Sequence, residues 1–289
     1  MKALVTGGSG FLGSFVVREL LDAGCNDVVI LMRGHDAAAC RARLRSLWHN
    51  RPELLAALDA RISVVCGDIT AERLGLNPGE YAELVGKVTH IVHTAAEIGV
   101  NETAQRFGEV NVGGTLHVLE FAHAAASAGA LEHLVHISTA YVAGTREGLV
   151  REDELVDAGF NSLYEQSKFG AEQLVRDVSS RIPVSIVRPA QIVGDTATGF
   201  AATFNTLYYP LKLYLTGKLP VLPVSAQQKL NMVPVDFVAR MAVRALLSPQ
   251  AVGKTFHAVI PASHQPTVGE LLAFVRDWSI QVLKYDPGT

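Results

Sequence analysis

Tyr164 and Lys168 lie four residues apart in the segment "LYEQSKFGAE", residues 163–172. On a helix, residues at this spacing are neighbours on one face, so the phenol and the ammonium can reach one point in space. A nearby positive charge favours phenolate and is expected to lower the pKa of the tyrosine from about 10 toward neutrality. The pair would then act as a proton donor, although a packed or solvated helix face is the alternative interpretation of so short a motif.

A glycine-rich segment, "VTGGSGFLGSF" at residues 5–15, joins a predicted strand to a predicted helix. Its spacing fits two dinucleotide-binding templates, one through Gly8, Gly10 and Gly13 and the other through Gly7, Gly10 and Gly13. Glycine at such a turn lets the backbone approach a pyrophosphate at the positive end of the helix. Because the segment opens a βαβ unit, as this motif requires, we predict a dinucleotide site there rather than a tight turn without a ligand.

Arg33 follows the next predicted strand, twenty residues after Gly13. Enzymes that use NAD usually have a carboxylate at this place for the ribose hydroxyl, whereas an arginine suits a 2′-phosphate. Arg41, Arg43 and Arg45 could add to the positive charge, although a solvated helix face is the simpler interpretation of these three. The sequence therefore favours NADP(H) over NAD(H).

Short apolar runs rich in β-branched residues recur along the chain, and longer segments with helical periodicity lie between them. The runs are at residues 3–6, 28–32, 62–65, 90–94, 134–138 and 184–187. In the helical segment 11–24, Leu12, Phe15 and Leu20 share one face and Gly24 supplies a stop. This alternation predicts an α/β fold of the Rossmann type, a doubly wound parallel sheet with right-handed crossovers.

The alternation of strands and helices ends after about residue 195, so we expect the chain to form a domain and a smaller region. Residues 1–195 are expected to form the NADP-binding Rossmann domain. The segment 194–223 is rich in Gly, Thr, Pro and aromatic residues and is expected to cover the substrate. Helices at 234–248 and 267–278 and a strand at 254–260 follow, so residues 196–289 should form mainly a small substrate-binding region whose returning strand and helices pack on the Rossmann domain.

The composition is that of a globular chain of 289 residues. Hydrophobic residues make up 49% and charged residues 18%, which suits a sheet covered on both faces. With 25 Lys and Arg against 28 Asp and Glu, no basic field favours nucleic acid or an acidic membrane surface. We find neither the pattern of a signal peptide at the N-terminus nor an apolar run long enough to span a membrane, so we expect a cytoplasmic protein.

The cysteines and histidines lack the spacing of a disulfide framework or a metal site. Cys25, Cys40 and Cys66 are few and odd in number, so we expect reduced core thiols. The acidic segment 152–154 is expected to be a solvated loop. Four histidines have a spacing that suits strand faces better than metal ligands, at His90, His93, His133 and His136. We therefore predict no metal.

The order of the motifs is more specific than any one of them. After the glycine segment and Arg33 come "GDI" (67–69), "HTAA" (93–96), "NVGGT" (111–115), "HISTAYVAG" (136–144), "YEQSK" (164–168) and "VRPAQIVG" (187–194). With these motifs the chain resembles the extended short-chain dehydrogenase/reductase superfamily over roughly residues 2–280. "GDIT" followed by "LGL", "QSKFGAEQLV", "RPAQIVGDTATG" and "VPVDFVA" make it similar to the thioester reductase branch. That branch includes terminal domains of carboxylic acid reductases, release domains of peptide synthetases and fatty acyl-CoA reductases.

The resemblance implies a catalytic group of Thr139, Tyr164 and Lys168. Lys168 would bind the nicotinamide ribose, and Tyr164 would protonate the oxygen on which charge develops as hydride arrives. Thr139 takes the catalytic hydroxyl position when counted back from Gly144, with Ser138 as the alternate. The resemblance also implies residues that contact the cofactor along its length, from the pyrophosphate and the 2′-phosphate to the adenine and the nicotinamide. These residues are Thr6, Gly7, Gly10, Phe11, Leu12, Gly13, Arg33, Arg43, Asp68, Ile69, Ala95, Ala96, Asn111, Tyr164, Lys168, Pro189 and Ile192.

The implied activity is the NADPH-dependent reduction of an acyl thioester, on a carrier protein or coenzyme A, to the aldehyde and optionally to the alcohol. Alternatives in the same superfamily are a ketone or hydroxysteroid-type reductase and a nucleotide-sugar epimerase or dehydratase; Arg33 argues against the epimerase. A non-catalytic dinucleotide sensor is disfavoured by the Tyr/Lys pair. Members of the branch usually continue beyond the point where this sequence stops, so we expect either a compact relative or part of a longer chain. The acyl group, the carrier, the number of electrons and the oligomeric state are left open.

Overall fold

The computed structural model describes residues 1–202, 207–218 and 224–287, and the chain forms two compact units. The first unit comprises Met1–Ala190 and Val235–Ala258, and the second comprises Gln191–Pro234 and Val259–Thr289. The division falls after Ala190 rather than near residue 195, because Gln191 already pairs with Met232 in a separate small sheet. Parts of the segment expected to cover the substrate, residues 203–206 and 219–223, lie outside the described residues.

The first unit is built on a seven-stranded parallel sheet, which confirms the predicted α/β fold. Its strands stand in the order β3-β2-β1-β4-β5-β6-β9. They are β1 (Ala3–Thr6), β2 (Val28–Met32), β3 (Ile62–Cys66), β4 (His90–His93), β5 (His133–Ile137), β6 (Val184–Pro189) and β9 (Thr255–Ala258). Every residue of the five inner strands is buried, as their continuous apolar runs predict.

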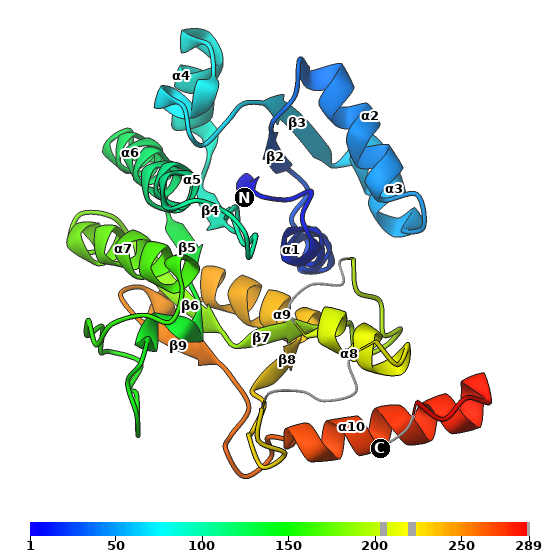
Figure 1. Cartoon of the computed structure of the whole chain (residues 1–289). Helices are drawn as coiled ribbons and strands as arrows, with labels where there is room; N and C mark the ends of the chain where they lie inside the picture. The colour runs from blue at the N-terminus through cyan, green and yellow to red at the C-terminus, as the bar shows by residue number, and fades with distance from the viewer. Residues whose placement is uncertain (203–206, 219–223, 288–289) are drawn as a thin grey trace. The chain divides into compact units, whose positions relative to one another are not determined.

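Helices cover both faces of this sheet, with α1, α2, α3 and α9 on one face and α4, α5, α6 and α7 on the other (Figure 1). The α-helices are α1 (Phe11–Asp22), α2 (Ala37–Leu47), α3 (Pro52–Ala60), α4 (Pro78–Lys87), α5 (Ala104–Phe107), α6 (Gly114–Ser127), α7 (Leu163–Val178) and α9 (Val235–Leu246). Shorter helical turns are η1 (Glu72–Gly75), η2 (Gly108–Gly113), η3 (Ala140–Ala143) and η4 (Pro249–Ala251). On the α6 side, Phe121 and Ala125 pack in one core with Leu4, Ile91 and Leu134 of the sheet.

The register brings the carboxyl ends of the inner strands to one edge of the sheet. Thr6, the last residue of β1, pairs with Leu31 on one side and with His93 on the other. His93 in turn pairs with His136 of β5. The chain runs from β1 outward in both directions along the sheet, and ligands of such folds bind where the strand order reverses. The loops after β1, β4, β5 and β6 therefore form one surface at this edge.

The second unit contains the parallel strands β7 (Gln191–Val193) and β8 (Met232–Pro234). Its helical elements are α8 (Tyr208–Leu215), α10 (Val268–Trp278) and η5 (Ser279–Leu283). A capping box between Thr267 and Glu270 fixes the start of α10, the helix predicted at residues 267–278. In the described ranges, no helix has both the length and the apolar character that crossing a membrane requires.

Candidate active site

The turn between β1 and α1 has the shape of an anion cradle. Gly7 has φ +73°, and a Cβ at that residue would lie 2.7 Å from the amide nitrogen of Ala95. A Cβ on Gly13 would lie 2.1 Å from the carbonyl oxygen of Gly7, so only glycine fits there. Gly8 instead packs against Ile30, which favours the template through Gly7, Gly10 and Gly13 over the template through Gly8.

The start of α1 presents backbone amides at a glycine turn without a side-chain cap. Gly10 is the N-cap residue, so no side chain caps the helix, and the first turn contains no acidic residue. The amides of Phe11, Leu12 and Gly13 therefore lie at the positive end of the helix dipole without a competing carboxylate on their own helix. These features fit the pyrophosphate of a dinucleotide.

Thr6 supports the cradle from the end of β1. Its buried hydroxyl lies 2.7 Å from Nδ1 of His93 and accepts a hydrogen bond of 3.3 Å from the amide of Ala95. Ala96 follows in the same loop and is half-buried. The loop after β4 is thus held against the glycine turn, where Ala95 and Ala96 were expected to line the path of the cofactor.

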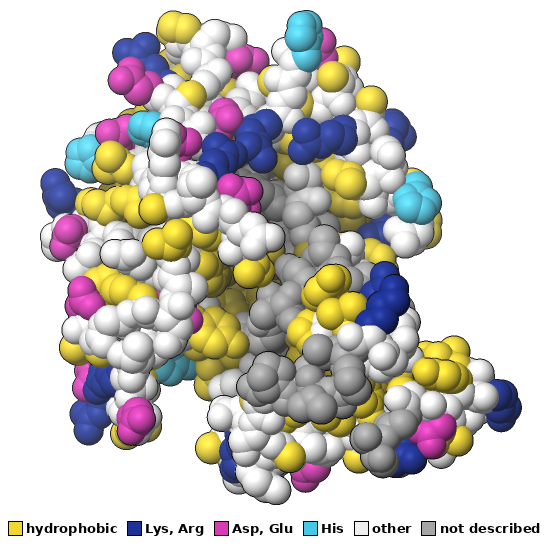
Figure 2. Space-filling view, viewed as in Figure 1, with side chains coloured by type: hydrophobic (Ala, Val, Ile, Leu, Met, Phe, Trp, Pro, Cys, Tyr) yellow, Lys and Arg dark blue, Asp and Glu magenta, His cyan; other side chains and the backbone are white. Residues whose placement is uncertain are grey.

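Arg33 and Arg43 come together beyond the end of β2. Both side chains are exposed, and Nη1 of Arg43 donates to the carbonyl oxygen of Arg33 at 3.1 Å. Arg41 and Arg45 instead form ion pairs with Asp59, which agrees with the simpler interpretation of these two residues. Within the described residues, no carboxylate pairs with Arg33 or Arg43. Figure 2 shows Lys and Arg side chains gathered over the surface where Figure 1 places β2, β3 and α2.

Asp68 and Ile69 follow β3, the strand next to β2. Asp68 is half-buried and accepts a hydrogen bond of 2.9 Å from the amide of Thr70. Ile69 is buried and fills the space beside Gly114, where a Cβ would lie 2.6 Å from its Cδ1. Both residues follow Gly67, whose amide bonds the carbonyl oxygen of Met32 next to Arg33, and their contact with an adenine stays a prediction.

The predicted catalytic side chains meet at the carboxyl ends of β5 and β6. The buried hydroxyl of Thr139 hydrogen-bonds the phenol of Tyr164 and reaches the carbonyl oxygen of Pro189 at 3.3 Å. The hydroxyl of Ser138 is instead donated to Glu172 at 2.6 Å. The geometry thus favours Thr139 over Ser138 as the hydroxyl next to the phenol.

The expected lowering of the tyrosine pKa is wrong for this structure. Burial raises the pKa of Tyr164 to about 12, and the hydrogen bond from Thr139 offsets only part of this effect. The ammonium of Lys168 does not act on the phenol as expected, because its Nζ donates to the carbonyl oxygen of Ile137 at 2.8 Å. Burial lowers the pKa of Lys168 to about 8, with the Glu172 carboxylate opposing the shift. At neutral pH the phenol is therefore protonated and most of the lysine is charged.

A buried ion cluster behind the catalytic group is absent from the sequence predictions. Glu172 is 0% and Arg188 1% exposed, and the two are joined at 2.6 Å from Nη2 and at 3.0 Å from Nε. Arg176 adds a contact of 3.0 Å to the same carboxylate. Burial raises the pKa of Glu172, but the contacts with Arg188, Ser138 and Arg176 outweigh it, so the pKa is lowered overall.

Two signals in the sequence could have revealed this cluster. Tyr164, Lys168, Glu172 and Arg176 recur every four residues and so form one stripe along α7. Arg188 places a charge in the fully buried strand β6, and a buried guanidinium requires a partner.

The acidic segment 152–154 has a structural role through its backbone. Glu152 and Asp153 are exposed, as expected for a solvated loop. The carbonyl oxygen of Glu154, however, accepts a hydrogen bond of 2.7 Å from Arg188, and that of Asp153 accepts one of 3.0 Å from Arg176. This loop therefore completes the shell of acceptors around the two arginines.

Asn111 links the loop after β4 to helix α7. It lies 1% exposed in the π-helical turn η2, a geometry frequent at functional sites. Its side chain accepts from the amide of Glu97 at 2.7 Å and donates to Ser167 Oγ at 2.8 Å. Ser167 precedes Lys168, so Asn111 fixes the helix that carries the catalytic pair.

The four histidines predicted on strand faces are buried core groups, at His90, His93, His133 and His136. His93 lies between Thr6 and Thr115, and burial lowers its pKa to about 3. Among the residues that the structure describes, neither ring nitrogen of the fully buried His136 has a hydrogen-bond partner. Burial likewise holds the pKa of His136 well below its usual value. Both rings are therefore neutral at pH 7.

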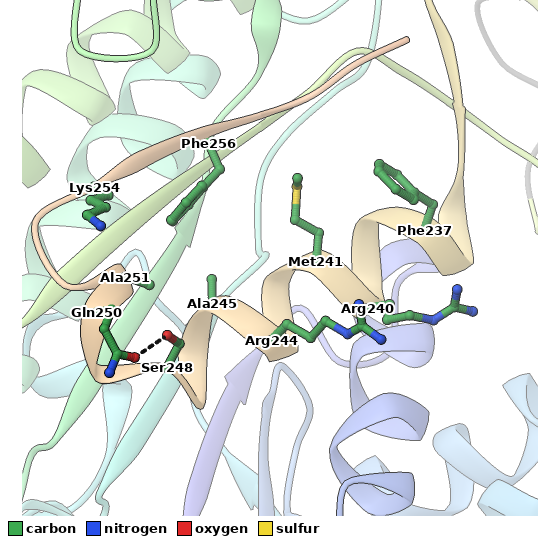
Figure 3. Close-up of a pocket in the computed structure, with 10 residues that line it drawn as sticks. All are labelled: Phe237, Arg240, Met241, Arg244, Ala245, Ser248, Gln250, Ala251, Lys254 and Phe256. Atoms are coloured by element: carbon green, nitrogen blue, oxygen red, sulfur yellow. Dashed lines mark hydrogen bonds between the residues drawn. The ribbon is translucent and has the colours of Figure 1, made fainter.

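Ile192, expected to contact the nicotinamide, belongs to β7 of the second unit and pairs with Val233, and its contact with the nicotinamide stays a prediction. A groove of about 470 Å³ follows α9 and β9, with Phe237, Met241 and Phe256 along it (Figure 3). None of the predicted site residues lines this groove.

The sequence profile of the Male sterility protein family matches residues 5–242. The chain belongs to this family. Its fold matches the terminal R domain from the myxalamid PKS-NRPS biosynthetic pathway with a TM-score of 0.86 and 30% identity, over 96% of this chain and 70% of that one. The reductase (R) domain of a nonribosomal peptide synthetase from Mycobacterium tuberculosis matches with a TM-score of 0.77 and 26% identity, over 100% of this chain and 72% of that one.

A curated relative is the L-2-aminoadipate reductase of Saccharomyces cerevisiae, 28% identical over 86% of this chain and 19% of the yeast protein. The chain spans between 5% and 27% of the length of three such relatives. These matches confirm the predicted superfamily and its thioester reductase branch. They also confirm the enzyme class, an oxidoreductase that uses a nicotinamide dinucleotide.

Replacing Glu172 by alanine is expected to lower the free energy of unfolding by about 3–5 kcal/mol, because the guanidinium of Arg188 is left buried without its counter-charge. Urea unfolding at pH 7 measures the change. Glu83→Ala is the matched control. Glu83 forms an i,i+4 ion pair with Lys87, as Glu172 does with Arg176, but on an exposed surface, so this substitution should not change the free energy of unfolding measurably. Equal losses in the two variants would contradict the structural role of the cluster.

The stabilisation by Glu172 also depends on pH in a defined direction. Because its pKa in the folded protein is lowered, the contribution is complete above the ordinary glutamate value of 4.5 and is lost as the pH falls through the folded value. The difference in unfolding free energy between the wild type and Glu172→Gln should therefore narrow in acid. A difference that widens in acid would contradict the lowered pKa.

Proposed function

We propose that the chain reduces an acyl thioester to an aldehyde with NADPH. The observation that carries the proposal is the group of Thr139, Tyr164 and Lys168 at the sheet edge that also holds the glycine cradle. The R domains and the aminoadipate reductase that the chain resembles support a thioester as the substrate class.

The side chains of the catalytic group position the thioester carbonyl and supply a proton. Bound NADPH supplies the hydride for the carbonyl carbon of the thioester. The hydroxyls of Thr139 and Tyr164 hold the carbonyl oxygen, and Tyr164 donates its proton as negative charge develops there. With a pKa of about 12 the phenol is fully protonated beforehand, so it acts as a donor and not as a base in this direction. The resulting hemithioacetal collapses as its C–S bond breaks, and its hydroxyl proton passes to the departing sulfur, so that the aldehyde and a thiol are released.

Lys168 is proposed to serve both the cofactor and the proton donor. Its ammonium is anchored by the carbonyl oxygen of Ile137 and lies one helical turn from Tyr164. It can hydrogen-bond the nicotinamide ribose, and by turning from Ile137 toward Tyr164 when the cofactor binds it is proposed to stabilise the phenolate left after proton transfer. Glu172 favours the charged form of Lys168 and so supports this role from the protein side.

The 2′-phosphate of NADPH is proposed to bind Arg33, with Arg43 beside it. Both guanidiniums are exposed, and within the described part of the chain neither has a carboxylate partner. Arg43 holds the backbone of Arg33 through its carbonyl oxygen. The two guanidiniums can therefore make charge-assisted hydrogen bonds to a phosphate without breaking an existing ion pair.

The acyl group is proposed to arrive on a thiol carrier, either a carrier protein or coenzyme A. The resemblance to domains of peptide synthetases supports the carrier protein. The second candidate function is the reduction of free ketones or aldehydes, since the same Tyr/Lys/Thr group can protonate any carbonyl oxygen. Substrate tests separate the two candidates.

An acyl thioester should oxidise NADPH in the presence of this protein and release free thiol in a fixed ratio, whereas nucleotide sugars should give no reaction. The ratio is one thiol per NADPH if the aldehyde leaves and one per two if it is reduced again. NADPH absorbance and a thiol reagent measure the two quantities with short, medium and long acyl chains. Consumption of NADPH with ketones or aldehydes, and no thiol from any thioester, would establish the carbonyl reductase in place of the thioester reductase.

Tyr164→Phe should lower turnover by a factor of about a hundred to ten thousand, the usual effect of losing a general acid. The affinity for NADPH should change little, because the ring remains. Steady-state rates and NADPH fluorescence titrations check the two parts. Tyr81→Phe provides the control, since Tyr81 packs on Phe121 away from the catalytic group. Unchanged turnover in Tyr164→Phe would remove the phenol from the mechanism.

Arg33→Ala should weaken NADPH binding by about tenfold or more and NADH binding far less, because one charge-assisted phosphate contact is lost. Dissociation constants of both cofactors give the preference directly. Arg45→Ala is the matched control, since Arg45 already pairs with Asp59. If Arg33→Ala weakens both cofactors equally, Arg33 supports the loop instead of binding the phosphate.

A further inference from the structure

Two cysteine thiols meet beside the proposed phosphate site. Cys66 ends β3 and pairs in register with Met32, the last residue of β2. Cys40 lies near the start of α2 and is 1% exposed, whereas Cys66 is half-buried. Both sulfurs lie against one residue, Gly34: the sulfur of Cys66 is 3.0 Å from its carbonyl oxygen, and a Cβ on Gly34 would lie 2.3 Å from the sulfur of Cys40. Both are free thiols, and the fold brings together two positions that the sequence separates.

Both thiols hold the turn that follows Arg33. The thiol of Cys66 donates to the carbonyl oxygen of Gly34 at 3.0 Å. The thiol of Cys40 donates to the carbonyl oxygen of Met32 at 3.4 Å. Cys40 also packs against Gly34 so closely that a Cβ on this glycine would lie 2.3 Å from the sulfur. The backbone on both sides of Arg33 thus depends on donors from the two cysteines.

We propose that Cys40 and Cys66 form a reversible disulfide and that this modification weakens NADPH binding at the adjacent Arg33 turn. The disulfide itself follows from the position of both sulfurs against Gly34. Its effect on the cofactor rests on the proposed role of Arg33 in binding the 2′-phosphate.

A peroxide is the oxidant for this reaction. The thiolate of Cys66, the more accessible of the pair, attacks hydrogen peroxide and becomes a sulfenic acid with the release of water. The sulfur of Cys40 then attacks the sulfenic sulfur, forms the S–S bond and expels a second water, which carries away its proton. In total two thiols and one peroxide give one disulfide and two waters. An external dithiol restores both thiols by exchange.

Oxidation removes both donors from the turn. A disulfide has no S–H, so the carbonyl oxygens of Gly34 and Met32 lose the hydrogen bonds that the reduced cysteines give them. The backbone of Gly34 is also in contact with the sulfur of Cys40, which must shift to form the bond. The neighbouring Arg33 then no longer presents its guanidinium at the geometry of the reduced protein. A contact with the 2′-phosphate suffers more than contacts with the rest of the dinucleotide.

The full chain is treated with hydrogen peroxide, quenched and analysed by peptide mass mapping without reduction. The expected product is a Cys40–Cys66 disulfide, with Cys25 remaining a free thiol because it is buried and donates to the backbone of Met1. NADPH and NADH titrations before and after oxidation should show NADPH binding weakened by about tenfold, NADH binding affected less, and recovery with a dithiol. Cys66→Ser retains a hydroxyl donor for Gly34 and should abolish the response to peroxide.

Distinct results overturn the two parts of the proposal. Oxidation of Cys66 to higher acids, or links to other chains without a Cys40–Cys66 bond, would overturn the modification site. Formation of that bond with unchanged NADPH affinity would overturn its effect on the cofactor. Failure of the proposed function is seen separately, because Arg33→Ala would then leave the preference for NADPH intact while the mass mapping still shows the disulfide.

Discussion

The buried ion pair between Glu172 and Arg188 is the interaction on which the catalytic edge of the first unit depends. It joins helix α7 to strand β6, and through Ser138 it also reaches the end of β5. One carboxylate therefore joins α7, which carries Tyr164 and Lys168, to β6 and to the end of β5 beside Thr139. Two ions without contact with water are costly to desolvate, so such a pair is tolerated only where every donor and acceptor is satisfied. The carbonyl oxygens of the 151–154 loop and Nε2 of His257 supply the remaining acceptors for Arg188.

The surroundings of the catalytic group set its protonation state. Burial raises the pKa of Tyr164 and lowers that of Lys168, so burial alone favours the neutral form of both. Glu172 opposes this effect for the lysine, and Thr139 partly opposes it for the tyrosine. The site thus combines a protonated phenol with a lysine that is still charged at neutral pH. In a more exposed site the lysine would also be charged, but the pKa of the tyrosine would not be raised by burial.

The sequence predicts the large sheet well, because the inner strands are buried on both faces and appear as continuous apolar runs such as residues 28–32. It does not reveal β7 and β8, whose three residues each carry no periodicity. The four-residue spacing of Tyr164 and Lys168 identifies their shared helix face but not the direction of the ammonium, which turns to Ile137. Hence the predicted lowering of the pKa of Tyr164 is wrong. The proposed roles of Arg33 and Thr139 remain predictions that the geometry supports.

The return of the chain to the first unit has a consequence for the order in which the protein can fold. Strand β9 belongs to the large sheet and pairs with β6, yet the whole segment Gln191–Pro234 separates the two strands along the chain. A nascent chain that has emerged only as far as Ala190 therefore exposes the unpaired edge of β6, including the backbone next to Arg188. Closing so long a connection costs conformational entropy before any strand pairing rewards it. Completion of the sheet must wait for translation of the second unit's first segment, and in that interval the edge of β6 is open to pairing with another chain.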